Sequence, residues 1–431
     1  MQILKVKGQP AIIQRLVKGT FWSLTGSVVS KCLVLLSTAI VTHILSQGEY
    51  GRVGLIRTTI QMFSSLLGLG MGATASKYIA QYRQDNFPKA FKMYLVSNLF
   101  AWFVGILSCL VIVACAPWIA GFSLHDESLT AELRLGGLIL LFCVINGAQQ
   151  GTLAGFEDFK GIAIVNLLMG VCEVVFLYLG SSWGGVGGTL LGFGLVYFTV
   201  AGLNFLRIRK HISYDWSYMF KMMAELRPRD FKVVITFSLP VALSSLVCVP
   251  ALWWSKTFLA GEVGYEAVAV FDIADQWKGQ ILFIPATIAA VLLPIVSSSK
   301  QRSDSVRVLK FNLGINIIVT LLLSALIFAG RDVIMQFYGE SYTNSWPLFI
   351  LSLTAILTSI SNVLGTAFFA IGKPMKVLFC NTLLGVAVVV FSYISIRQNH
   401  SEDALAYAHL WSYLVFVLCL SVFSYYNFKH L

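Results

Sequence analysis

The sequence predicts an all-α integral membrane protein with twelve transmembrane helices in two six-helix lobes. Three observations predict this fold class: the composition, twelve long apolar stretches, and an internal repeat at about half the chain length. Of the 431 residues, 57% are hydrophobic and only 12% are charged, and the mean hydropathy is +0.78. A soluble protein of this length needs more polar surface, so the chain belongs in a bilayer.

Each apolar stretch is long enough to cross the hydrocarbon core as a helix, which takes about 20 residues. In the first half of the chain they are residues 19–43, 53–76, 94–117, 133–155, 161–180 and 184–206. In the second half they are residues 233–259, 265–297, 309–330, 346–370, 377–396 and 405–428. The eighth stretch contains Pro285 and Pro294 and is expected to bend.

The repeat appears as matched glycines. Gly51 corresponds to Gly264, an offset of 264 − 51 = 213, and the pair Gly151-Thr152 corresponds to Gly365-Thr366, an offset of 365 − 151 = 214. Six spans per half is an even number, so both halves enter the membrane in the same orientation, related by a pseudo-twofold axis along the membrane normal. We predict an N-terminal lobe at 1–206, a basic cytoplasmic linker at 207–232 and a C-terminal lobe at 233–431, with a substrate site between the lobes.

The basic residues predict the orientation. With Arg134 and Lys310, at the ends of their spans, counted with the adjacent loops, placing alternate loops on alternate sides puts 23 of the 31 Lys and Arg on the side of the N-terminus, four on the other side, and four inside spans. Both termini are therefore expected in the cytoplasm. The net charge of +11 reflects this topology, and no nucleic-acid partner is expected.

The sequence lacks the usual marks of an enzyme. All eight cysteines lie inside spans without C-x-x-C spacing, and we interpret them as inert core residues. No spacing indicates a metal site, no phosphate-binding loop or nucleophile elbow occurs, and no cofactor is expected. The longest external loops, near residues 116–132 and 331–345, are too short for a catalytic domain.

Four basic residues inside spans are candidates for anion binding: Lys31, Arg57, Lys256 and Lys278. An ionised group at bilayer depth costs at least about 2.5 to 3.5 kcal/mol unless it faces protein or water, so each should point inward. Arg57 and Lys31 have no acid at helical spacing in their own spans, and structural pairing would need Glu173 or another distant partner. Lys256 has the alternative of reaching the external headgroups.

The eighth span carries two acids, Asp272 and Asp275, with Lys278 three residues after the second. This mixed charge predicts a proton-linked switch, with Glu173 as a third candidate for ion coupling. The alternative is that Lys278 and Asp275 only neutralise each other.

Polar and aromatic side chains inside spans are candidates to line the cavity. Asn146, Gln149 and Gln150 in the fourth span bind sugar hydroxyls in one interpretation and hydrogen-bond a neighbouring helix in the other. The remaining candidates are Gln61, on the helical stripe of Arg57, and the pair Trp253-Trp254.

Three short motifs carry a family resemblance. Gln47-Gly48-Glu49-Tyr50-Gly51 follows the first span, and Gly68-Leu69-Gly70-Met71-Gly72 leads to Lys77-Tyr78-Ile79-Ala80-Gln81-Tyr82 after the second. With the repeat, they resemble the Wzx-type polysaccharide flippases of the multidrug/oligosaccharidyl-lipid/polysaccharide exporter superfamily, over nearly the whole chain.

The resemblance implies a V-shaped cavity between the lobes, as in multidrug exporters of the superfamily. It implies transport of undecaprenyl-pyrophosphate-linked oligosaccharide, such as an O-antigen unit, from the cytoplasmic to the periplasmic leaflet of the bacterial inner membrane. Further partners would be membrane lipids, a coupling proton or Na⁺, and polysaccharide assembly proteins. The four buried cations would meet the pyrophosphate, and the amides and tryptophans the glycan.

Other functions remain as alternatives. A cation-coupled multidrug exporter of the same superfamily would favour acids in its cavity, whereas the first lobe here is basic. A sugar-transporting major facilitator would carry a G-x-x-x-D-R/K-x-G-R/K-R/K signature, which residues 77–92 lack. A membrane glycan polymerase is disfavoured by the short external loops.

Overall fold

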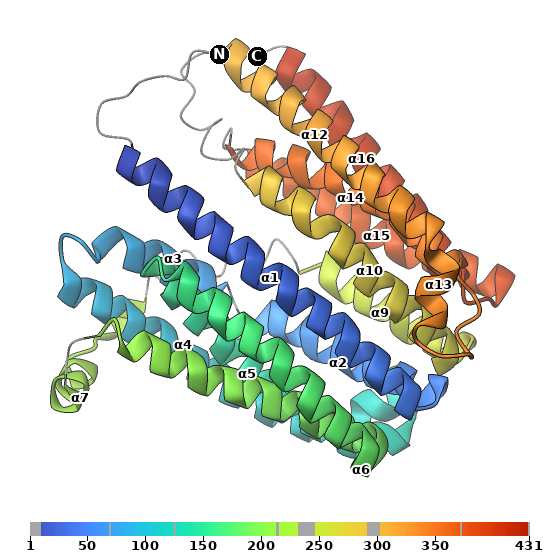
Figure 1. The fold of residues 1–431 in the computed structure, drawn as a ribbon, viewed down its shortest axis with the longest axis horizontal. Coiled ribbons are helices and arrows are strands. Elements are labelled where there is room, and N and C mark those ends of the chain that lie inside the picture. Colours follow the sequence, from blue (N-terminus) through green and yellow to red (C-terminus); the bar gives the residue numbers. More distant parts are fainter. Residues whose placement is uncertain are drawn as a thin grey trace. The chain divides into compact units, whose positions relative to one another are not determined.

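In a computed structural model of the protein, the described residues are 10–68, 70–124, 126–212, 215–231, 246–290, 302–370 and 373–429. Every regular element in them is helical (Figure 1). The chain forms two compact units. Unit 1 comprises Met1–Val41, Phe63–Ala120 and Ser128–Leu243, and unit 2 comprises Thr42–Met62, Gly121–Glu127 and Ser244–Leu431.

Unit 1 holds most of α1 (Pro10–Ile44) together with α3 (Met71–Tyr82), α4 (Phe87–Trp118), α5 (Thr130–Gly155), α6 (Phe159–Arg209) and α7 (Trp216–Ala224). Helices α3 and α5 touch backbone to backbone. A Cβ atom on Gly72 would lie 2.7 Å from the carbonyl oxygen of Gly147, and one on Gly151 would collide with the backbone of Gly72. Only glycine allows this approach, which is common between membrane helices.

Helix α6 contains both the fifth and the sixth predicted spans. Its helical geometry is broken at Gly184 and Gly185, and Gly185 has φ +54° and ψ −132°, a conformation that glycine tolerates. A Cβ on Gly180 would collide with the carbonyl oxygen of Gly188, so the two legs lie close together. The green segment turns back on itself at this point (Figure 1).

Unit 2 contains most of α2 (Gln47–Leu67), and the last residues of this helix belong to unit 1. It also contains α9 (Cys248–Glu262), α10 (Tyr265–Ala290), α12 (Arg302–Ala329), α13 (Arg331–Gln336), α14 (Trp346–Ala370), α15 (Pro374–Asn399) and α16 (Ala404–Lys429). Helix α14 packs against α10, α12 and α16. Apolar side chains such as Phe368, Val388 and Leu420 are fully buried there.

Within the described residues, seven helices are long and apolar enough to cross a membrane, and α6 is long enough to do so twice. The predicted spans 233–259 and 265–297 lie partly outside the described residues. The all-helical fold is as predicted, while the twelve-helix layout and the lobes at 1–206 and 233–431 stay predictions. Residues 42–62, from the first predicted lobe, are grouped with unit 2.

Candidate functional site

Five charged side chains of unit 2 form one continuous row of ion pairs. Arg57 Nη2 lies 3.2 Å from Asp272 Oδ2, and Lys256 Nζ lies 2.9 Å from Asp272 Oδ1. Lys256 Nζ also lies 3.4 Å from Asp275 Oδ2, and Lys278 Nζ lies 2.6 Å from Asp275 Oδ1. We call this row, Arg57–Asp272–Lys256–Asp275–Lys278, the charge chain. Its charges alternate in sign, and each carboxylate bridges two cations.

A tight helical hairpin sets Lys256 against Asp272. Helices α9 and α10 meet at Gly264, whose φ of +121° favours glycine. Its N–H group donates a hydrogen bond to the carbonyl oxygen of Leu259 at 3.3 Å. Lys256 lies eight residues before Gly264 and Asp272 eight residues after it (264 − 256 = 272 − 264 = 8), so the two side chains face each other across the hairpin.

Glycines on α2 let Arg57 reach this hairpin. A Cβ on Gly51 would collide with the carbonyl oxygen of Tyr265, and one on Gly54 would lie 3.2 Å from Asp272 Oδ2. Larger residues at these two positions would hold α2 away from α10. Gly51 is one of the glycines that mark the sequence repeat, and its role here is close helix packing.

Neutral polar groups support the charge chain. Gln276 Nε2 donates to the Tyr50 hydroxyl at 2.9 Å and lies 3.5 Å from Asp272 Oδ2. Trp253 Nε1 donates to Thr59 Oγ1 at 2.9 Å. Both hydrogen bonds link α2 to α9 or α10, so they hold Arg57 in register with the acids.

The sequence-based reasoning missed Tyr50, Thr59 and His409. His409 on α16 is buried, with its Nε2 3.5 Å from Ser255 Oγ and its ring edge-on to Phe271 at 5.1 Å. A single histidine inside an apolar span was the available signal for it. Tyr50 and Thr59 carry no charge and gave no such signal.

The charge chain carries three positive and two negative side chains, a surplus of one positive charge. Its centre is buried, with the side chains of Asp272 and Lys256 only 4% and 9% exposed, while Arg57 is 22% exposed. Buried charges are tolerated when they are paired, and unpaired ones are costly. Of the two cations that pair with Asp272, Arg57 is the more exposed. Arg57 can therefore leave Asp272 and bind another anion at a lower free-energy cost than Lys256.

These contacts decide between several alternatives. Lys278 pairs with Asp275 as the spacing predicts. Lys256 does not extend to the headgroups but is buried among the acids. Asp272 is a distant partner of Arg57.

The candidate residues of unit 1 lie on α1, α5 and α6. Lys31 is half-buried on α1, and Glu173 is buried on α6. On α5, Asn146 Nδ2 donates to the carbonyl oxygen of Tyr197 at 3.0 Å, and Gln150 Nε2 lies 3.4 Å from Asn166 Oδ1. Both amides thus bond the neighbouring helix, and Gln149 beside them is buried. Their proposed roles toward a substrate stay predictions.

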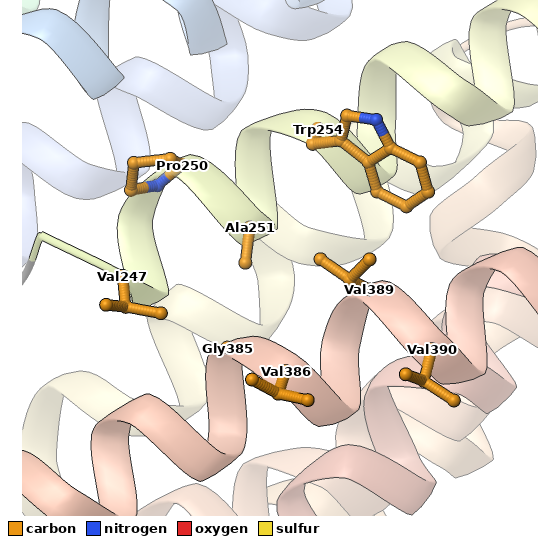
Figure 2. Close-up of a pocket in the computed structure, with 8 residues that line it drawn as sticks. All are labelled: Val247, Pro250, Ala251, Trp254, Gly385, Val386, Val389 and Val390. Carbon is orange, nitrogen blue, oxygen red and sulfur yellow. The ribbon is translucent and has the colours of Figure 1, made fainter.

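Trp254 lies away from the charged groups. Its ring stacks on Phe258 with centroids 4.9 Å apart, and it borders a groove of about 360 Å³ between α9 and α15. Figure 2 shows Val389 of α15 pointing toward α9 in this groove. The lining offers little that could bind a polar headgroup. Gln61 on α2 is exposed.

Comparison with known proteins gives a family match over most of the chain. Residues 16–300 match the family described as "Polysaccharide biosynthesis protein". The EPS I polysaccharide export inner membrane protein EpsE of Ralstonia solanacearum is 19% identical over 408 residues, covering 92% of this chain and 90% of that protein. The lipid III flippase of Escherichia coli K12 is 21% identical over 412 residues, covering 95% and 98%.

Among solved structures, the fold is similar to that of a multidrug resistance MATE family transporter of the MOP superfamily, in its inward-facing conformation. The TM-score is 0.80 with 17% sequence identity, covering 93% of this chain and 95% of the other. At this identity the likeness establishes the fold alone.

Proposed function

The chain belongs to the polysaccharide biosynthesis protein family, and from this we propose that it is a flippase of the MOP superfamily for lipid-linked oligosaccharide. Its substrate would be an undecaprenyl-pyrophosphate-linked repeat unit, moved from the cytoplasmic to the periplasmic leaflet of a bacterial inner membrane by alternating access. The names of the relatives, a lipid III flippase and a polysaccharide export protein, support a lipid-linked substrate. They favour transport over catalysis.

The observation that carries the proposal is the charge chain. A pyrophosphate crossing the membrane needs cations at depth, and the chain offers three cations against two carboxylates. The guanidinium of Arg57 matches phosphate oxygens with two parallel hydrogen bonds, which a lysine cannot do. The pyrophosphate would displace the carboxylate of Asp272 from Arg57, and Asp272 would keep Lys256 as its partner.

This exchange gives the anion a way to drive movement. Arg57 comes from the first sequence repeat and Asp272 from the second, so their ion pair ties the repeats together. An anion that takes Arg57 favours the arrangement in which this tie is broken, and only such differential affinity can shift a conformational equilibrium. Protonation of Asp272 or Asp275 would act on the same pairs, and Glu173 would be the corresponding group of unit 1.

A cation-coupled multidrug exporter is the second candidate, favoured by the fold of the solved relative. Its cargo would be organic cations, which the surplus positive charge of the charge chain would repel.

The test is restoration of surface polysaccharide in flippase-deficient bacteria, across strains with different glycans. We expect Arg57→Ala and Lys31→Ala to reach the membrane but lose polysaccharide, and Arg57→Lys to restore part of it. Arg52→Ala is the matched control, because Arg52 lies on the same helix and pairs with Asp126 at 3.3 Å but is 40% exposed. If the protein exports cationic dyes and restores polysaccharide in no strain, the flippase proposal is wrong and the multidrug exporter is the better assignment.

A further inference from the structure

A second candidate site lies in unit 2, beside the charge chain. It is a cavity of about 520 Å³ between α9, α10, α14, α15 and α16, within the size range of ligand pockets, about 300 to 1,000 Å³. None of the described residues that line it is charged. Tyr413 lines the cavity, and Lys278 Nζ lies 5.8 Å from the centre of its ring, so the cavity adjoins one end of the charge chain.

In the first sequence repeat, the equivalent place is closed. Gly72, Gly147 and Gly151 form the seam between α3 and α5, where backbone meets backbone and no Cβ fits on Gly72 or Gly151. Such a seam leaves no room for a ligand.

In the second repeat, the same positions are open. The residues 214 positions after the three seam glycines (365 − 151 = 214) are Ala286, Ser361 and Gly365, and all three line the cavity. Among the residues that the structure describes, no atom lies within 4 Å of a Cβ on Gly365. A glycine inside a helix costs about 1 kcal/mol relative to alanine, and no close packing by the described part of the chain accounts for Gly365. Its missing side chain enlarges the cavity.

The lining combines apolar side chains with uncharged polar groups, which suits a neutral ligand that carries hydroxyl groups on an apolar ring. Ser361 and Thr366 donate their hydroxyl hydrogens to helix carbonyls at 2.8 and 2.7 Å, which leaves their oxygens as acceptors. Asn362, exposed on the same face of α14, adds amide donors and an acceptor, and Phe369 adds an aromatic face. No carboxylate among the lining residues could hold a hard metal cation.

We propose that this cavity binds one neutral sugar residue of the transported oligosaccharide, a role that rests on the proposed flippase function. The pyrophosphate at the charge chain and the sugar in the cavity would then be held together through Lys278 and Tyr413. The second repeat would thus recognise the glycan, at positions whose equivalents in the first repeat are packed together and leave no cavity.

The native thiol of Cys248 lines the cavity and can report its occupancy. The wild-type protein in nanodiscs is treated with N-ethylmaleimide, and modification of Cys248 is measured by peptide mass spectrometry. The probes are glucose, galactose, N-acetylglucosamine, glycan-free undecaprenyl pyrophosphate and sodium chloride. We expect at least one sugar to slow the modification, by about tenfold at ten times its Kd. Cys115, which the structure shows to be exposed and not a core residue as the sequence predicted, is the internal control and should react at an unchanged rate.

Substitutions of residues that line the cavity test whether the effects come from the cavity itself. Asn362→Ala should abolish protection by the sugar, and Gly365→Leu, which fills the cavity, should abolish transport. Gly314→Leu is the control, since a Cβ on Gly314 likewise has no atom of the described residues within 4 Å and Gly314 is not among the described residues that line the cavity.

Two results would overturn the proposal: protection by sodium chloride or glycan-free undecaprenyl pyrophosphate but by no sugar, and normal transport by Gly365→Leu. Either would leave the flippase function intact. If a sugar protects Cys248 but the protein restores no polysaccharide, the flippase proposal is wrong, while the assignment of the cavity as a sugar site stands.

Discussion

Arg57 and Asp272 lie 215 positions apart in the sequence, and their side chains meet at 3.2 Å. This separation is close to the offset of the sequence repeat, so the pair joins corresponding helices, α2 and α10, of the two repeats. Gly51 and Gly54 allow the approach, and the bonds from Gln276 to Tyr50 and from Trp253 to Thr59 maintain it. The contact is therefore built by several side chains rather than by one ion pair.

The first prediction ranks the members of the charge chain by their contribution to stability. Asp272→Asn should destabilise the protein by about 3 to 5 kcal/mol, because it removes the carboxylate that pairs with both buried Lys256 and Arg57. Arg57→Ala should cost less, because Asp272 keeps Lys256 and Arg57 is partly exposed. Thermal unfolding of the purified variants measures both. A larger loss in Arg57→Ala would contradict the assignment of Asp272 as the central bridge.

The second prediction concerns ion coupling. If Asp275 senses protons, Asp275→Asn should slow translocation and change its response to a collapsed pH gradient, while headgroup binding survives. If Asp275 only neutralises Lys278, the double variant Asp275→Asn with Lys278→Met should recover the activity lost in either single variant, because Lys256 keeps Asp272 as a partner. Transport assays in vesicles with and without a pH gradient distinguish the two. Full recovery would leave Asp272 or Glu173 as the coupling group.

The third prediction compares one repeat position in both halves. Gly151→Ala should destabilise the protein strongly, because its Cβ would collide with the backbone of Gly72. Gly365→Ala should be neutral or stabilise by up to about 1 kcal/mol, because alanine is the better helix former and its Cβ meets no atom of the described residues within 4 Å. Melting temperatures of the two variants give the comparison. Equal losses would mean that the cavity wall at Gly365 is packed in the folded protein.

Local spacing predicted part of the site from sequence. Lys278 and Asp275 are one helical turn apart on α10, so their ion pair follows from helix geometry alone. The repeat likewise identified Gly51 and Gly264 as equivalent positions of the two halves. It could not predict that Gly51 packs against the residue after Gly264, since that depends on how the helices cross.

Contacts between distant segments were beyond sequence reasoning. The partner of Arg57 was left open between Glu173 and other acids, because nothing local distinguishes them. Gly151 and Gly365 are repeat equivalents, yet one is packed and the other borders a cavity. That difference depends on the packing of neighbouring helices and is invisible in the residue itself.

A cluster of charged residues outside the spans surrounds Asp158, which lies in the loop between α5 and α6. Asp158 accepts hydrogen bonds from Arg207 Nε at 2.5 Å and from the N–H group of Gly161 at 2.9 Å, and His211 Nε2 lies 2.8 Å from it. Burial raises the pKa of the Asp158 carboxyl, but the hydrogen bonds from Arg207, His211 and Gly161 outweigh burial and lower the pKa to about 2. The fold therefore favours the ionised form of Asp158.

The fourth prediction follows from this lowered pKa. In the unfolded chain the pKa of an aspartate carboxyl is about 3.9. The stabilisation by ionised Asp158 is therefore complete above that pH and is lost as the pH falls toward about 2. Asp158→Asn keeps a cap acceptor for α6 but removes the charge, and it should lower the melting temperature at pH 6. The gap from the wild type should shrink between about pH 4 and pH 2. Asp85→Asn, at an exposed position, should show no gap at any pH. A gap for Asp158→Asn that stays constant over this range would mean that its charge contributes nothing to stability.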